Sequence, residues 1–174
     1  MRTRKWKTLA IIFTAATLVA VVSLVQATLN YTKFYETKLV LSYKDFKIFI
    51  KPDVIEVEGN FTLSNPSGYS GLELLSLGLE VNFVDNSTMI MLAEGGHTFE
   101  RQLIEPYSSI TFKISSTAGT GTEEGKLFIE LASRGNIEFV ITAHTFLATF
   151  LGPTVTELDP IKFTYPKQPQ TNLP

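Results

Sequence analysis

The sequence predicts an all-β fold, an antiparallel immunoglobulin- or fibronectin-like β-sandwich of about seven strands, preceded by one N-terminal transmembrane helix. Three observations lead to this prediction. Apolar and polar residues alternate with a period of two through much of residues 39–165, as in half-buried strands. Clusters of Gly, Pro, Asn, Asp and Ser separate the alternating segments, as in sandwiches. The N-terminal 26 residues differ, because a basic start precedes an apolar run.

The N-terminal segment has the features of a membrane anchor. A basic segment, residues 1–7, precedes an uncharged apolar run at residues 8–26, and a helix needs about 20 residues to cross a bilayer. Positive charge before the run keeps the N-terminus in the cytoplasm. We therefore predict a single-pass membrane protein that contacts lipid through this helix and has an extracytoplasmic C-terminal domain. The expected anchoring residues are Arg2, Arg4, Lys5, Trp6 and Lys7.

A cleavable signal peptide is the alternative interpretation of this segment. Val25-Gln26-Ala27 has the small-x-small pattern of a cleavage site, and the segment begins with basic residues. The apolar run is longer than the roughly 7–15 residues usual in a signal peptide, which favours a retained anchor. Both interpretations place the following domain outside the cytoplasm.

The first two strands follow a short juxtamembrane linker, which we place at residues 27–38. The first strand is expected within residues 39–51, where three charged residues interrupt the alternation. The second strand, residues 55–63, alternates regularly, with its odd positions mostly apolar. The sandwich domain is therefore predicted to begin at residue 39 and to end at residue 165.

The same alternation predicts the later strands. Apolar residues recur at every second position within residues 77–83, 110–114, 127–131 and 161–165, and residues 137–151 form a long stretch rich in β-branched and aromatic residues. The segment 137–151 is long enough for one bent strand or two, and residues 72–77 could form a short helical turn. Residues 166–174 are rich in proline and polar residues, and we expect a flexible tail there. Turns are predicted at residues 65–68, 85–87, 95–96, 119–125 and 134–136.

Asn65 and Pro66 form the best-defined of these turns. Pro66 has a fixed φ and disfavours the helical conformation at Asn65. The Asn65 side chain can hydrogen-bond to the backbone beyond the end of the strand. We interpret the pair as a strand-ending turn that directs the chain across the sandwich.

Charge and cysteine content exclude several functions. Four of the 15 Lys and Arg residues lie in residues 1–7, which leaves 11 against 17 Asp and Glu, a formal charge of −6 for the exported part. Nucleic acid is therefore not expected as a partner, because phosphates require a basic surface. The chain has no cysteine, which excludes disulfides, thiolate metal sites and thiol nucleophiles.

We predict no catalytic, cofactor-binding or metal-binding residues, and we do not expect an enzyme. His97 and His144, the only histidines, have no ligand partner at metal-binding spacing. Ser70, within Gly68-Tyr69-Ser70-Gly71, is one residue short of a nucleophile elbow. The Gly-rich stretch before Lys126 contains two glutamates, which would repel a phosphate.

Three sequons make the exported domain a candidate glycoprotein. They begin at Asn30, Asn60 and Asn86, whereas Asn65 is excluded by the proline that follows it. Asn86 lies in a predicted hairpin turn and is the most accessible. Asn60 should face outward if Phe61 faces the core, and Asn30 lies very close to the membrane.

Three segments together resemble the water-stress and hypersensitive-response domain of the type 2 late-embryogenesis-abundant family. They are an alternating strand that runs into Asn-Pro and then an aliphatic segment (57–83), a strand after a Pro-Tyr-Ser-Ser cluster (103–112), and two strands joined by an apolar Leu-Gly link (138–163). Ser67 stands where the family often has Asn, and the Gly/Thr-rich stretch near residues 117–125 is longer. The resemblance implies a seven-stranded sandwich with a short helix and no catalytic residues. It also implies a role in desiccation or stress, or in membrane-anchored envelope proteins.

The favoured function is a non-enzymatic, membrane-anchored module that contacts a protein partner in the membrane or envelope, as a scaffold or accessory subunit. Such a module could bind its partner through an exposed edge strand. A stress-protective domain is the first alternative, and it follows from the family resemblance. A module that binds an apolar ligand between the sheets, near Phe146-Leu147 and Phe150-Leu151, is the second alternative.

Overall fold

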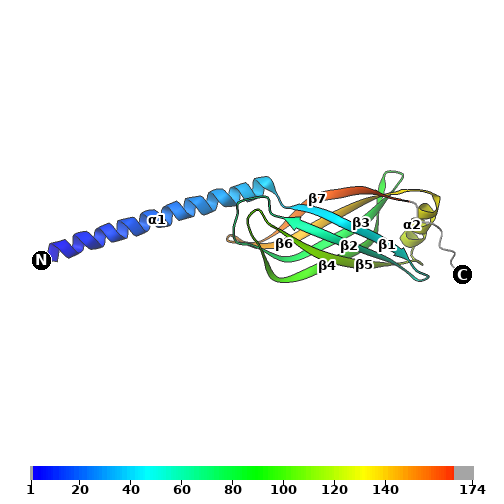
Figure 1. The fold of residues 1–174 in the computed structure, drawn as a ribbon, viewed down its shortest axis with the longest axis horizontal. Coiled ribbons are helices and arrows are strands. Elements are labelled where there is room, and N and C mark those ends of the chain that lie inside the picture. The colour runs from blue at the N-terminus through cyan, green and yellow to red at the C-terminus, as the bar shows by residue number, and fades with distance from the viewer. Residues whose placement is uncertain (1, 167–174) are drawn as a thin grey trace.

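A computed structural model describes residues 2–166 of the chain (Figure 1). One long helix leads into a sandwich of seven strands, and a short second helix lies at the opposite end. This architecture confirms the predicted all-β sandwich preceded by one helix. Along the chain the elements are α1 (Arg2–Thr37), β1 (Val40–Ile50), β2 (Val54–Ser64), β3 (Leu72–Asp85), β4 (Thr88–Ile104), β5 (Ser109–Gly119), α2 (Glu123–Arg134), β6 (Ile137–Thr149) and β7 (Gly152–Tyr165).

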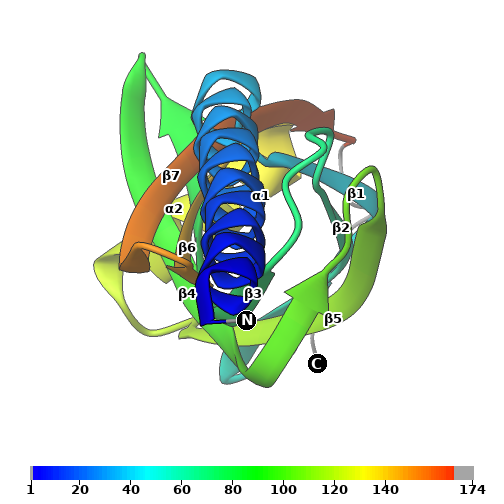
Figure 2. The ribbon, with the colours of Figure 1, turned by 90° about the vertical axis from the view of Figure 1, so that its left-hand side faces the viewer.

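The strands form two antiparallel sheets, ordered β1-β2-β5 and β4-β3-β6-β7. Successive strands run back and forth along the long axis, so the loops gather at two ends (Figure 1). Figure 2 looks along this axis from the end that α1 enters. We call the end that α1 enters the helix end and the opposite one the far end. The helix end carries the loops 65–71, 105–108 and 150–151. The far end carries the turns 51–53 and 86–87 together with α2.

The predicted alternation of β2 is confirmed by its burial. Every odd position from Ile55 to Leu63 is buried, and the even positions are half-buried. Leu77, Leu79 and Phe83 of β3 continue the same pattern from the facing sheet. These side chains fill the space between the sheets, and burying each large aliphatic or aromatic one contributes roughly 1.5–3 kcal/mol.

A β-bulge explains the irregular alternation of β1. Tyr43 pairs with Phe61 and Asp45 pairs with Asn60, so Lys44 is an extra residue on the β1 strand. The bulge shifts the inward and outward positions by one residue. The charged residues of this segment are thereby accommodated on an edge strand without burial.

The predicted strand at residues 127–131 is wrong, because these residues belong to α2. The Thr122 hydroxyl accepts a hydrogen bond from the Gly125 N–H over 3.0 Å and caps the helix. Phe128 and Ala132, four residues apart, are buried on one helical face, whereas the residues beside them are half-buried. A short apolar segment fits the periodicity of a helix as well as that of a strand, and the Thr122 cap favours the helix here. The short helix implied by the family resemblance is therefore present at these residues.

Two smaller expectations also differ from the structure. Residues 72–77 form the start of β3 rather than a helical turn. Gly95-Gly96 lies inside β4 rather than in a turn. A Cβ on Gly95 would lie 3.0 Å from the Ile114 side chain, so the missing side chain lets β4 approach β5 closely. Residues 137–149 form one strand, β6.

The N-terminal helix extends well beyond the predicted span of residues 8–26. It is continuous to Thr37, so residues 27–37 of the predicted linker are helical and only Lys38 and Leu39 separate α1 from β1. Most of the predicted flexible tail, residues 167–174, lies outside the described residues.

Candidate functional site

The N-terminal part of α1 is exposed on all sides. Every described side chain from Lys5 to Gln26 is exposed. The helix is long and apolar enough to cross a membrane, by length and composition. An apolar helix in the core of a soluble domain would be mostly covered by protein, whereas the side chains of this one are exposed over that length.

Contact with the sandwich begins at Ala27 and follows one face of the helix. Ala27, Asn30 and Tyr31 are half-buried, and Phe34 is 4% exposed. These four residues are spaced i, i+3, i+4 and i+7, which places them on one side of a helix. We call them the docking stripe. The stripe starts one residue after the predicted membrane span ends, so the apolar helix and the docked helix meet at Gln26–Ala27.

The docking stripe packs against an aromatic cluster at the helix end of the sandwich. The ring centroid of Tyr31 lies 5.0 Å from that of Phe150 and 5.6 Å from that of Tyr69. Phe34 lies 5.4 Å from Tyr69, and Tyr35 lies 5.2 Å from Tyr31. Each such pair contributes roughly 0.5–1.5 kcal/mol beyond the area it buries. The helix is therefore joined to the sandwich by side-chain packing as well as by the chain.

Two tyrosines of this junction have shifted pKa values. Burial raises the pKa of Tyr31 above its ordinary value, and a hydrogen bond with Tyr35 adds to this effect. The hydrogen bond with Thr154 lowers the pKa of Tyr35, and the hydrogen bond with Tyr31 acts in the same direction. The hydrogen bond between Tyr35 and Thr154 thus joins α1 to β7 and adds a polar contact to the aromatic packing of the junction.

The turn at Asn65-Pro66 holds Tyr69 in place. The Asn65 side chain is 1% exposed. Its Oδ1 accepts hydrogen bonds from the backbone N–H of Ser67 (3.0 Å) and the Ser67 hydroxyl (2.6 Å). Its Nδ2 donates to the carbonyl of Tyr69 (3.2 Å) and to that of Glu105 (3.4 Å). Asn65 thus connects the loops 65–71 and 105–108 and positions the ring against which α1 packs.

A crevice of about 520 Å³ lies at the helix end, between the docking stripe and the β6–β7 hairpin. Ala27 and Asn30 line it from the helix, and Phe150 and Pro153 line it from the hairpin. Arg101 and Glu73, whose side chains approach to 3.8 Å, also contribute to its wall. The crevice thus lies beside the point on α1, at Gln26–Ala27, where the exposed part of the helix ends and the docking stripe begins.

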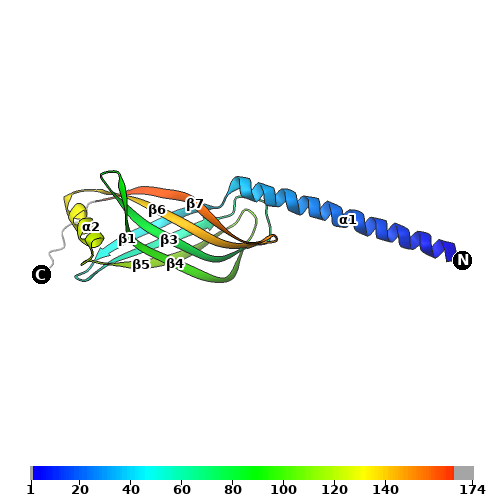
Figure 3. The ribbon, with the colours of Figure 1, turned by 180° about the vertical axis from the view of Figure 1, so that it is seen from behind.

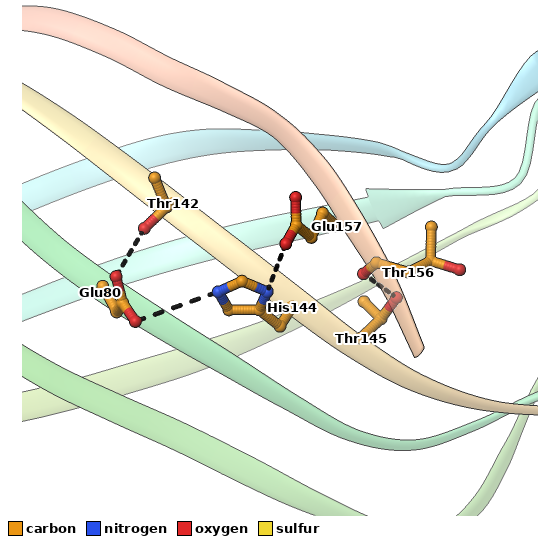
Figure 4. Close-up of polar contacts among 6 residues, drawn as sticks. All are labelled: Glu80, Thr142, His144, Thr145, Thr156 and Glu157. Atoms are coloured by element: carbon orange, nitrogen blue, oxygen red, sulfur yellow. Dashed lines mark hydrogen bonds and ion pairs between the residues drawn. The ribbon is translucent and has the colours of Figure 1, made fainter. Parts of the chain in front are cut away.

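The structure also brings polar residues together on the outer face of the β4-β3-β6-β7 sheet (Figure 4). His144 lies 4.0 Å from Glu80 through Nε2 and 4.0 Å from Glu157 through Nδ1. The Thr142 hydroxyl donates to Glu80 over 3.1 Å. The His144 side chain is 43% exposed on an open sheet face, where water is not excluded. Residues 2–166 contain no group of three or more His, Cys, Asp or Glu arranged to hold a metal ion.

The other residues considered in the sequence are dispersed. His97 lies exposed on β4 with its ring 4.5 Å from Phe99, and β3 separates it from His144. Ser70 is exposed in the loop after Tyr69. The structure does not bring either residue together with His144.

The three sequons lie at different heights on the domain. Asn30 is on the docking stripe and lines the crevice. Asn60 is half-buried in β2 and pairs with Asp45 and Lys113 of the neighbouring strands. Asn86 is exposed at the far end with φ of 47°. Their glycosylation remains a prediction.

The docking stripe was not predicted from the sequence. A signal is present in the sequence, since aromatic residues at positions 31 and 34 continue the helical spacing beyond the predicted membrane span. The prediction of a linker at residues 27–38 equates the length of the helix with the length of the apolar run. The contact that joins the helix to Tyr69 and Phe150 involves residues distant in sequence, which periodicity does not reveal.

Comparisons with known proteins identify the fold. No family model matches the sequence. No curated protein matches it either. The solution structure of AT1g01470 from Arabidopsis thaliana is 12% identical, covers 76% of this chain and 83% of its own, and has a TM-score of 0.52. The crystal structure of a protein from Archaeoglobus fulgidus is 10% identical, covers 73% of this chain and 98% of its own, and has a TM-score of 0.41. At 12% identity the likeness to AT1g01470 shows the fold alone, so the family resemblance remains a prediction.

Proposed function

We propose that this chain is a non-enzymatic, single-pass membrane protein that holds an acidic β-sandwich against the extracytoplasmic face of the bilayer. In that position the sandwich serves as a scaffold or accessory subunit for a protein partner in the membrane or envelope. The observation that carries the proposal is the boundary at Gln26–Ala27. An exposed apolar helix ends there, and a helix docked on the sandwich begins.

The energetics of the exposed helix support a membrane location. Apolar side chains that no protein covers are unfavourable in water and favourable in lipid. The basic residues before the helix support a cytoplasmic N-terminus, and the domain then lies on the opposite side. With its formal charge of −6 the domain is not attracted to anionic headgroups, so the helix must supply the membrane attachment.

The outer sheet surface supports a role in protein contact. Phe146 of β6 pairs with Val155 of β7, and their side chains are 40% and 66% exposed. Adjacent exposed apolar side chains of this kind are typical of contact sites. The β7 edge is less suited to strand addition, because Pro153 and Pro160 lack the N–H that a new strand would need. The partner is therefore expected on this outer face.

Two measurements on intact membranes test the proposal. The full chain should resist alkaline extraction, and protease added outside should reach the sandwich. A photocrosslinking residue at Val155 should then recover one stoichiometric neighbour, and the same residue at exposed Ser115 on β5 should not. Release by alkali would contradict the anchor. Resistance to alkali without a neighbour specific to Val155 would contradict the partner role.

A further inference from the structure

We propose that the tip of the β6–β7 hairpin, Phe150-Leu151, inserts into the interfacial region of the outer leaflet as a second membrane contact. The occupant of this surface is the bilayer that α1 crosses, so the inference rests on the proposed function. It goes beyond that function because it assigns a lipid-binding role to the sandwich domain itself.

The tip lies beside the part of α1 where the predicted membrane span ends. Phe150 and Ala27 line the same crevice, and the Phe150 ring is 5.0 Å from the Tyr31 ring. Figures 1 and 3 show the β6–β7 turn beside α1, farther toward the N-terminus of the helix than the point where α1 ends. Gln26, the last residue of the predicted membrane span, is adjacent to Ala27. A helix that crosses the bilayer to Gln26 therefore brings the tip to the lipid headgroups.

The residues at the tip are unusual for a hairpin turn in water. Thr149 pairs with Gly152, which leaves Phe150-Leu151 as a two-residue turn. Such turns normally contain Gly, Asn or Asp. Phe150 is 50% exposed and Leu151 is 67% exposed, so the sandwich covers neither fully. Exposed aromatic and aliphatic side chains at this height are suited to the membrane interface.

The backbone N–H groups at the tip already donate hydrogen bonds within the protein, which lowers the cost of removing the turn from water. The N–H of Phe150 donates to the Tyr69 hydroxyl over 3.1 Å, and the N–H of Leu151 donates to the Thr149 hydroxyl over 3.3 Å. The Thr149 hydroxyl donates to the carbonyl of Gly152 over 2.9 Å. A backbone donor that lacks a partner in lipid is costly, and both donors of this turn already have one.

Charge distribution distinguishes this hairpin from the turns at the far end. Residues 145–156 contain no charged residue. At the far end, Lys51 and Asp53 lie in one turn, Asp85 precedes the other, and α2 begins with Glu123 and Glu124. In an acidic domain, a charge-free segment can approach a bilayer without the cost of desolvating a charge.

Depth-dependent fluorescence quenching tests the inference on the full chain. The native chain has no cysteine, so one environment-sensitive label can be attached at a single introduced cysteine. The variants are Leu151→Cys at the tip, Val155→Cys as a control of nearly equal exposure on the same hairpin, Lys126→Cys on α2, and Val19→Cys within the helix. Each is reconstituted into neutral phosphatidylcholine vesicles that carry quenchers at shallow or deep positions.

The inference predicts that shallow quenchers reduce the Leu151 signal strongly, the Val155 signal less and the Lys126 signal least, while deep quenchers reduce the Val19 signal. Quenching at Leu151 no greater than at Lys126, with Val19 still quenched, overturns the tip insertion and leaves the anchor intact. Equal quenching at Leu151 and Val155 means that the hairpin lies flat, which also overturns tip insertion. Absence of quenching at Val19 overturns the proposed function itself.

Discussion

The Tyr69 hydroxyl accepts a hydrogen bond from the backbone N–H of Phe150 over 3.1 Å and so connects the β2–β3 loop to the β6–β7 hairpin. The Tyr69 ring is 3% exposed and packs between Phe34 and Tyr31 of α1 and Phe150. One side chain therefore joins three parts of the chain that are distant in sequence. The arrangement of the helix, the loop and the hairpin depends on it.

Replacing Tyr69 by Phe removes only the hydroxyl and leaves the packing of the ring. The Phe150 N–H then loses its acceptor in a partly buried place, and we expect unfolding to become easier by about 1–2 kcal/mol. Urea unfolding of the full chain in detergent, followed by circular dichroism, measures the change. Tyr107→Phe is the control, because Tyr107 is 77% exposed at the same end. Equal effects of the two substitutions would show that the hydrogen bond has no special importance.

Replacing Asn65 by Ala removes four hydrogen bonds from a buried turn. The partners left unsatisfied predict a loss of about 3 kcal/mol or more in the free energy of unfolding. Ser67→Ala removes the hydroxyl that links Asn65 to the Tyr69 N–H and should cost less, about 1–2 kcal/mol. The same urea titration compares them. A smaller loss for Asn65→Ala than for Ser67→Ala would contradict this account of the turn.

Phe128 of α2 is fully buried and contacts Phe83 and Phe139, with ring centroids 5.8 and 6.0 Å away. We expect Phe128→Ala to destabilise the domain by about 3–5 kcal/mol. Ile129→Ala should cost much less, because Ile129 is only half-buried. If these residues formed a strand, Ile129 would face the core, and Ile129→Ala would then destabilise the domain more than Phe128→Ala. Thermal unfolding of the two variants therefore also tests the assignment of the helix.

The turn at Asn86-Ser87 has positive φ at both residues, 47° and 69°, as in a type I′ hairpin. Serine is strained in this conformation and glycine is not. Ser87→Gly should therefore raise the free energy of unfolding by about 0.5–1 kcal/mol, and it keeps the Asn86 sequon. Ser87→Ala, which relieves no strain, should give no gain. Stabilisation by both substitutions would point to a cause other than backbone conformation.

Glycosylation in a eukaryotic secretory pathway should occur mainly at Asn86, which is exposed at the far end. Asn30 lies on the docking stripe next to the predicted membrane span, and Asn60 is half-buried between two strands. An amidase-sensitive shift in electrophoretic mobility should therefore disappear in Asn86→Gln and persist in Asn30→Gln. Loss of the mobility shift in Asn30→Gln alone would contradict the placement of Asn30 on the docking stripe, facing the sandwich.

Much of the sandwich could be predicted from local pattern. β2 alternates regularly because one of its faces is buried along its whole length, and β3 does so from Leu77 to Phe83. The interruption of the alternation in β1 coincides with the bulge at Lys44. Local alternation was sufficient for β2 and for this part of β3 because each has one face turned to the interior of the sandwich along that length.

Helix α2 and the docking stripe could not be predicted from local alternation. Leu127, Ile129 and Leu131 fit a strand, and the decisive signals lay at the ends, where Thr122 caps the helix and Gly135 follows it. The junction required contacts among Phe34, Tyr69 and Phe150, which lie far apart in the sequence. A period describes which side of an element is apolar and does not show which other element covers it.

The helical continuity from the predicted membrane span to Thr37 has a consequence for proteolysis. Proteases that release extracellular domains cut flexible, extended segments near the membrane, and a docked helix presents none. Residues 27–37 are helical, and Phe34 is anchored in the core. Shedding of this domain would first require α1 to detach from Tyr69 and to unwind. The domain is therefore expected to remain attached for as long as its sandwich stays folded.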